Sequence, residues 1–216
     1  MNTGTCKGLG AVALCLALSA CDDLNIPGLS GDQSDKTFAA SKASLGRGTV
    51  SLVPPDGFCI DTRSVRQSFA IMARCDTLGA PVLTDAPLAV ITATTIAAQT
   101  DAAIDPARLE AGTETVLVRS DAGALSLVQV QGRPPSPEMR NTYWRAAGRV
   151  GNQVLGLALY QAADRPDLGD AAMALLVETM QRTSQQTEAD AATRQDNSAT
   201  ADTNQTAVGF RAGLFE

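Results

Sequence analysis

The segment over residues 143–160 restricts the fold more than any other part of the chain. Three glycines lie within nine residues of it, namely Gly148, Gly151 and Gly156. A glycine inside a helix costs about 1 kcal/mol relative to alanine, which argues against a helix here. Gly151 followed by Asn152 suits the central positions of a type II′ turn. We therefore predict a β-hairpin over this segment.

The position of that turn sets the register of the hairpin. With Gly151-Asn152 at the turn, Val150 faces Gln153, and side chains then alternate between the two faces of the sheet. One face carries an apolar set: Trp144, Ala146, Gly148, Leu155, Leu157 and Leu159. The other face carries four residues that we predict to be exposed and treat as a candidate binding face: Tyr143, Arg145, Arg149 and Tyr160.

A helix is expected after the hairpin, where it would cover the apolar face. Asp167 or Asp170 suits the N-cap. Apolar residues then recur at helical spacing: Met173, Leu176, Val177 and Met180. Packing against the hairpin accounts for this stripe, and a methionine-rich ligand groove is the alternative.

Further strands precede the hairpin. Apolar and β-branched residues between Pro, Gly and Asp predict strands over 49–53, 68–75, 88–95, 115–119 and 124–131. A short helix is expected to end at Glu110, and a loop over 120–123 is expected to place Gly123 at positive φ. The predicted fold class is α+β, with a mainly antiparallel curved sheet packed against a C-terminal helix.

Composition divides the rest of the chain. Residues 21–48 are rich in Ser, Gly, Asp, Lys and Ala, which predicts a disordered tether. A single domain is expected over 49–182, and a polar, low-complexity tail over 183–216. The tail ends in a short apolar cluster: Val208, Phe210, Leu214 and Phe215. This cluster is expected to fold back on the domain or to dock on a partner.

Residues 1–20 have the form of a secretory signal peptide. Lys7 precedes an apolar run over 9–20, which as a helix reaches about 18 Å and is too short for a hydrocarbon core of about 30 Å. The run leads into Leu18-Ser19-Ala20-Cys21, which resembles the lipobox of bacterial lipoproteins.

That resemblance implies a membrane anchor. In the family, the cysteine thiol receives a diacylglycerol, a dedicated peptidase cuts before it, and the new amino terminus is often acylated, as with palmitate. Cys21 would then hold the protein at the membrane, since two or three chains anchor stably. A plain cleaved signal peptide and an uncleaved anchor are alternatives. Asp22 resembles the inner-membrane retention signal of enterobacterial lipoproteins, although the outer membrane stays open.

The cysteine count agrees with export. Of the five cysteines, Cys6 and Cys15 would leave with the signal peptide and Cys21 would be lipidated, which leaves Cys59 and Cys75. In an oxidising compartment we expect these two to form a structural disulfide that stabilises the fold by about 3 kcal/mol in the chain-entropy model. Buried free thiols and a redox-active pair are alternatives.

Catalytic signals are few. The chain contains no histidine, which excludes Ser-His-Asp and Cys-His catalysis and His-ligated metals. It also lacks the common hydrolase and nucleotide-binding motifs. Asp56, Asp61 and Asp76 surround the cysteines, but aspartates there fit turns better than an acid–base pair or a calcium site. We predict no cofactor and no metal ligands.

The charge of the chain indicates which classes of partner to expect. The formal net charge is −6, from 17 Lys and Arg against 23 Asp and Glu, which argues against nucleic-acid binding. One basic stretch contrasts with this: Arg133, Arg140, Arg145 and Arg149 against a single Glu138. It overlaps the candidate binding face, and Arg and Tyr are common at interface hot spots. A solvated face, or one covered by another part of the chain, is the alternative.

A second resemblance concerns the mature chain. The run YWRAAGRVGNQVLGLALYQ before a helix is similar to uncharacterised lipoproteins of alphaproteobacteria and loosely to the Mog1/PsbP-like architecture. Members of that architecture mostly act in binding or assembly. We expect a lipid-anchored, periplasm-facing envelope protein with a non-catalytic binding or assembly role. Membrane lipid is one expected partner, through acylated Cys21, and an envelope protein is another. An envelope enzyme of a histidine-independent type is the alternative.

Overall fold

A computed structural model describes residues 37–99 and 106–209. The expectations for the signal peptide, for Cys21 and for the chain end at 210–216 concern residues outside these ranges.

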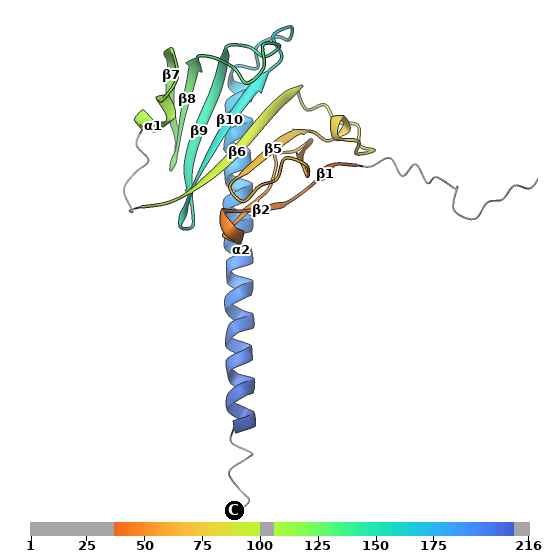
Figure 1. The fold of residues 1–216 in the computed structure, drawn as a ribbon, viewed down its shortest axis with the longest axis vertical. Helices are drawn as coiled ribbons and strands as arrows, with labels where there is room; N and C mark the ends of the chain where they lie inside the picture. Colours follow the sequence, from red (N-terminus) through yellow and green to blue (C-terminus); the bar gives the residue numbers. More distant parts are fainter. Residues whose placement is uncertain (1–36, 100–105, 210–216) are drawn as a thin grey trace, which may run out of the picture. The chain divides into compact units, whose positions relative to one another are not determined.

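An eight-stranded antiparallel sheet forms the main layer of the fold (Figure 1). Its strands in chain order are β1 (Ala39–Ala40), β4 (Phe58–Asp61), β5 (Phe69–Arg74), β6 (Ala89–Ala97), β7 (Thr115–Ala122), β8 (Leu125–Gln131), β9 (Thr142–Val150) and β10 (Gln153–Gln161). In space the order is β1-β4-β5-β6-β10-β9-β8-β7, so the β9–β10 hairpin lies in the middle of the sheet. The sheet and its covering helix give the α+β fold that the sequence predicts.

The remaining elements are short, with one exception. A two-stranded sheet pairs β2 (Ala43–Leu45) with β3 (Val50–Leu52). The short helices are η1 (Gly46–Gly48), η2 (Asp76–Leu78) and α1 (Pro106–Glu110). The exception is α2 (Asp170–Gly209), a helix of 40 residues. Each strand expected before the hairpin is present, and the loop expected over 120–123 is shorter because β7 continues to Ala122.

The central hairpin has the predicted register. Val150 pairs with Gln153, Trp144 with Leu159, and Gly148 with Leu155. A type II′ turn requires a positive φ at its first central residue and a negative φ at its second. Gly151 has a φ of 57°, and Asn152 is not among the described residues with positive φ, so the turn meets both conditions.

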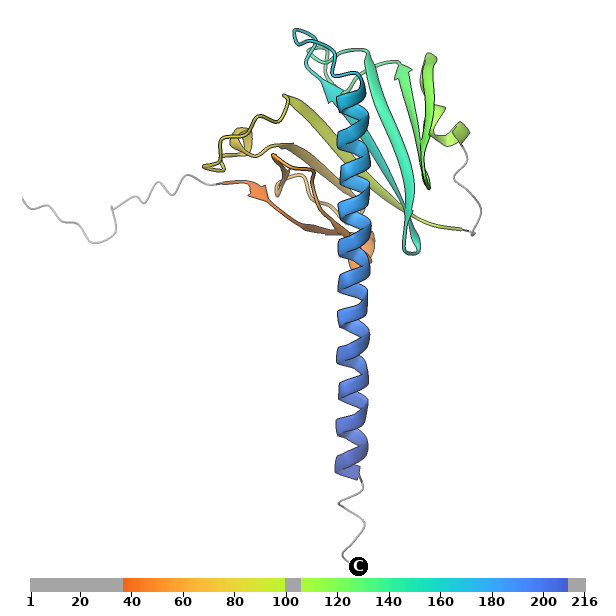
Figure 2. The same ribbon diagram turned by 180° about the vertical axis from the view of Figure 1, so that it is seen from behind.

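Helix α2 covers one face of the sheet, as Figure 2 shows. Leu176 is fully buried and Met180 nearly so, and they join Trp144, Leu155 and other strand residues in the main core. Gly148 has a packing reason for lacking a side chain, because a Cβ there would lie 3.0 Å from the Met180 Sδ atom. The predicted packing of the apolar stripe is confirmed.

The domain begins earlier than residue 49, where the sequence placed its start. Strands β1 and β2 both lie in the stretch predicted to be a tether, and β2 pairs with β3 through Ala43 and Leu52. Leu45 is fully buried in the main core. Strands this short carry too few residues to show a periodic pattern, so composition alone suggested a linker.

The domain also extends past residue 182, because α2 continues through most of the predicted tail. Thr183 and Thr187 are buried, although neither is a large apolar residue. The Thr183 Oγ1 accepts a hydrogen bond from the Val53 backbone N–H at 3.1 Å, and the Thr187 Oγ1 accepts one from the Ser51 N–H at 3.0 Å. The helix is therefore held against β3 by threonines that supply acceptors to the backbone of the strand.

A polar cluster extends this contact further along α2. The Asp190 carboxylate accepts hydrogen bonds from Ser51 Oγ, from Gln186 Nε2 at 2.8 Å and from Lys42 Nζ at 3.2 Å. These three donors, with Ser51 first, lower the pKa of Asp190 from 3.8 to about 2.

None of the helices in the described ranges is both long and apolar enough to cross a membrane.

Candidate binding site on the open face of the sheet

The face of the sheet opposite α2, which we call the open face, carries all four residues of the candidate binding face. Tyr143, Arg145 and Arg149 alternate on β9 with residues of the main core, and Tyr160 lies on β10. The Tyr143 and Tyr160 ring centroids are 4.8 Å apart. The structure therefore brings these side chains together on one face.

Tyr143, however, is not exposed as the sequence predicted. It is only 3% exposed and belongs to a second apolar cluster with Leu109 of α1, Val128 and Val130 of β8, and Ala147. The short helix α1 covers this end of the open face. The alternative that another part of the chain covers the candidate binding face therefore applies at this end. Tyr160 is half-buried, so it remains partly accessible where Tyr143 does not.

Arg145 fastens α1 to the sheet. Its Nη1 donates hydrogen bonds to the carbonyl oxygens of Leu109 and Ala111, both at 2.9 Å, and its Nη2 donates to the Tyr143 hydroxyl at 3.1 Å. The guanidinium carbon also lies 5.3 Å from the Tyr143 ring centroid. All these acceptors are uncharged, so the contacts position the positive charge of Arg145 without neutralising it.

Tyr160 keeps its proton at neutral pH. Burial raises the pKa of its hydroxyl, Tyr143 adds to this shift, and Arg145 opposes it. The neutral phenol is both a donor and an acceptor of hydrogen bonds.

A cavity of about 570 Å³ opens on this face, over β6, β10 and β9 and beside α1. Its floor consists of small residues in the middle of strands: Thr92, Thr94, Ala147, Gly156 and Ala158. A Cβ on Gly156 would lie 3.0 Å from the Thr94 Oγ1, so even a methyl group there would crowd its neighbour. The hollow exists because large side chains are missing at the centre of the face.

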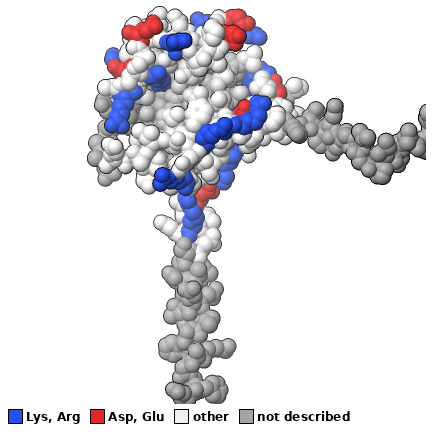
Figure 3. All heavy atoms as spheres, viewed as in Figure 1, with Lys and Arg blue, Asp and Glu red and all other residues white. Residues whose placement is uncertain are grey.

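The cavity is walled by cations. Arg108 of α1, Arg145 and Arg149 all line it, and none of its described lining residues is Asp or Glu. Figure 3 shows this face with an uncharged middle, with Lys and Arg side chains on both sides of it and Asp and Glu side chains mainly toward the top. On a chain of net charge −6, such a site favours an anionic ligand.

The acidic residues near the cysteines form no paired site. Each is bound to its own arginine: Asp56 to Arg182, Asp61 to Arg63 and Asp76 to Arg74. The hydrogen bond from Arg63 lowers the pKa of Asp61, and that from Arg74 lowers the pKa of Asp76. A general acid needs a raised pKa, so these carboxylates are surface ion-pair partners. The described residues contain no group of three or more potential metal ligands among His, Cys, Asp and Glu.

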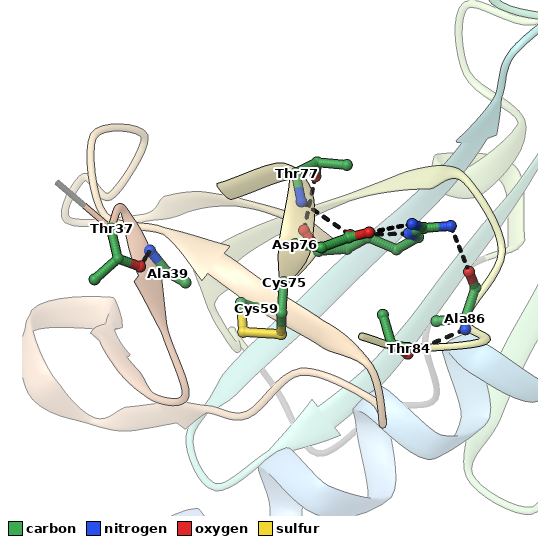
Figure 4. The surroundings of a disulfide bond; sticks show 9 residues. Thr37, Ala39, Cys59, Cys75, Asp76, Thr77, Thr84 and Ala86 are labelled. Atoms are coloured by element: carbon green, nitrogen blue, oxygen red, sulfur yellow. Dashed lines mark hydrogen bonds and ion pairs between the residues drawn. A yellow bond between two sulfur atoms is a disulfide. The ribbon is translucent and has the colours of Figure 1, made fainter. Parts of the chain in front are cut away.

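The predicted disulfide is confirmed. Cys59 on β4 and Cys75, directly after β5, are bonded with Cα atoms 4.8 Å apart (Figure 4). The bridge ties β4 to the start of η2, where the Asp76 carboxylate accepts hydrogen bonds from Arg74 and from the Thr77 N–H. Neither cysteine is among the described cavity-lining residues, so the bridge has a structural place in the fold.

Sequence reasoning missed Arg108 and the small residues of the floor. The predicted register already places Ala147, Gly156 and Ala158 on the same face as Arg145, which is the signal that a hollow lies there. Thr92 and Thr94 join them only because β6 pairs with β10, and Arg108 only because α1 folds over β8 and β9.

Comparison with known proteins adds no family. No protein-family profile matches the chain, and no curated protein is significantly similar to it.

Proposed function

We propose that the protein is a lipid-anchored envelope protein that works by binding a ligand in the cavity of the open face. One observation supports the binding role. The cavity has an uncharged floor and is bordered by Arg108, Arg145 and Arg149, with no carboxylate among its described lining residues. An enzyme using paired carboxylates would need acids to converge on this hollow. The geometry therefore favours a binder over the enzyme alternative.

The anchoring role rests on the sequence Leu18-Ser19-Ala20-Cys21. Acylation of Cys21 would hold the protein on the periplasmic side of a membrane, and Asp22 favours the inner one. Residues 22–36 span at most about 55 Å when fully extended, so the domain would stay close to the bilayer.

Labelling with a palmitate analogue tests the anchor. The native chain should be labelled and should fractionate with membranes, because acyl chains partition into the bilayer. Cys21→Ser should lose the label and either leave the membrane fraction or accumulate as an uncut precursor. Cys15→Ser is the matched control and should behave as the native chain. Equal labelling of the Cys21→Ser chain would refute the anchor.

Photo-crosslinking in cells tests the binding role. A photoreactive amino acid at Ile96, a cavity-lining residue that is 52% exposed, should give an adduct of defined mass. The same probe at Ala174, which is exposed on α2, is the control and should not give that adduct. Filling the floor with Ala158→Phe should abolish the Ile96 adduct. An adduct that persists in the filled variant, or appears equally at Ala174, would contradict binding in the cavity.

A further inference from the structure

The geometry points to a ligand class for this cavity: a free long-chain carboxylate with a single hydrocarbon chain, such as a fatty acid. Its carboxylate would lie at the α1 end, beside Arg108 and Arg145, and its chain would lie along β10 over Ala158 and Gly156. This inference rests on the proposed binding function and deepens it.

The dimensions of the cavity suit one such chain. A volume of about 570 Å³ falls in the range of about 300 to 1,000 Å³ typical of small-molecule sites. Along β10 the lining runs from Val154 to Tyr160, which in a strand covers about 20 Å. An acyl chain in one leaflet occupies about 15 Å, half of the hydrocarbon core. A single chain therefore fits along the strand.

The surface of the floor is suited to hydrocarbon. Ala147, Ala158 and Val154 present only methyl groups, and Gly156 presents none. The polar floor atoms are those of the threonines, where the Thr94 hydroxyl lies 3.4 Å from the Gly156 carbonyl oxygen. Ile96 at the margin of the cavity is 52% exposed, and a bound chain would remove it from water. A sugar or a small polar anion would leave this floor unused.

The charge at the α1 end is suited to a carboxylate. Arg63, Arg74 and Arg182 each have a carboxylate partner. Within the described ranges, by contrast, Arg108 makes no hydrogen bond or ion pair, and the acceptors of Arg145 are neutral. A guanidinium can bind a carboxylate through two parallel hydrogen bonds. The half-buried Tyr160 lies on the same wall and offers a neutral hydroxyl as a further donor.

The experiment uses the full lipidated chain in phosphatidylcholine vesicles with a photoactivatable 16-carbon fatty acid as the probe. After irradiation, mass spectrometry of peptides locates the adducts, which separates binding in the cavity from insertion of the probe into the bilayer. We expect adducts on peptides containing β6, β10 or α1. Unlabelled palmitate should compete, whereas hexadecanol should compete at least tenfold less well and inorganic phosphate should not compete.

Two matched pairs of variants sharpen the result. Arg108→Glu should weaken labelling about tenfold, the effect of losing one charge-assisted hydrogen bond. Arg133→Glu makes the same charge change at an exposed site outside the cavity and should have no effect. Ala158→Phe should abolish labelling, whereas Ala174→Phe on α2 should not. Circular dichroism should show the same folded signal for all four variants.

Three results would overturn the ligand class: equal competition by hexadecanol, labelling that Arg108→Glu and Ala158→Phe leave unchanged, or loss of labelling when phosphatidylglycerol vesicles replace phosphatidylcholine. The third would mean that the face binds an anionic bilayer surface. The fatty-acid probe could give no adduct on the cavity peptides while Ala158→Phe still abolishes the Ile96 adduct in cells. In that case the ligand class is wrong and the binding function stands.

Discussion

The two faces of the central sheet are made from alternate residues of the same strands, yet they are built differently. On the face covered by α2, Trp144, Leu155 and Leu157 fill the space up to the helix. On the open face, Ala147, Gly156 and Ala158 leave a hollow, which α1 bounds at one end. Side-chain volume therefore decides which face becomes core and which keeps a cavity.

The largest expected effect is on the covered face. Leu176→Ala removes a fully buried side chain between α2 and the sheet and should lower the free energy of unfolding by about 2 to 5 kcal/mol. Val154→Ala on the open face should cost below about 1 kcal/mol, because that side chain is only half-buried. Urea unfolding measures both. Equal losses would mean that the two faces do not differ as described.

The disulfide gives the next effect. Replacing Cys59 and Cys75 together by serine should lower the free energy of unfolding by about 3 kcal/mol. Because neither cysteine is among the described residues that line the cavity, labelling by the fatty-acid probe should be unchanged in the folded variant. Thermal unfolding with and without reductant provides the measurement. Alkylation of both thiols in the native, oxidised protein would refute the bridge.

How far sequence predicts structure depends here on the distance over which each feature is encoded. The hairpin register follows from Gly151-Asn152 and side-chain alternation, all within one short segment. The disulfide follows from the number of cysteines that the predicted signal peptide and lipidation would leave. The threonine contacts of α2 were not predicted, because Thr183 and Val53 are 130 residues apart and no local sequence pattern indicates that the two segments meet.

The candidate site was predictable only in part for the same reason. The register places Arg145, Arg149 and Tyr160 on one face, as predicted. The burial of Tyr143 depends on α1, whose Leu109 carbonyl accepts from Arg145 across 36 residues of sequence. A face that alternation marks as outward can therefore still be covered by a distant element.

The threonine contacts of α2 can be tested separately. Thr183→Val keeps the side-chain shape but leaves the Val53 N–H without its acceptor, which should cost about 1 to 3 kcal/mol. Thr193→Val is the matched control, since that exposed hydroxyl bonds only within the helix, to the Ala189 carbonyl, and it should change stability by less than about 0.5 kcal/mol. Urea unfolding distinguishes the two. Equal effects would show that the threonines do not hold the strand.

The smallest expected effect is a dependence on pH. Because the pKa of Asp190 is lowered in the folded state from 3.8 to about 2, the folded protein binds fewer protons than the unfolded one in that range. The contribution is fully present above pH 3.8 and is lost as the pH falls through about 2. Asp190→Asn should flatten the slope of stability against pH between about 2 and 4. A slope equal to that of the native chain would contradict the Asp190 cluster.

The most direct test of a cavity on one face compares alanines of the two faces. In ¹³C-methyl NMR of the full chain in phosphatidylcholine nanodiscs, titration with palmitate should shift Ala147 and Ala158, which line the floor. The methyl groups of Ala70 and Ala172, which belong to the main core and are not among the cavity-lining residues, should stay unchanged. No shift at Ala147 and Ala158, or equal shifts on both faces, would contradict a ligand-binding cavity on the open face.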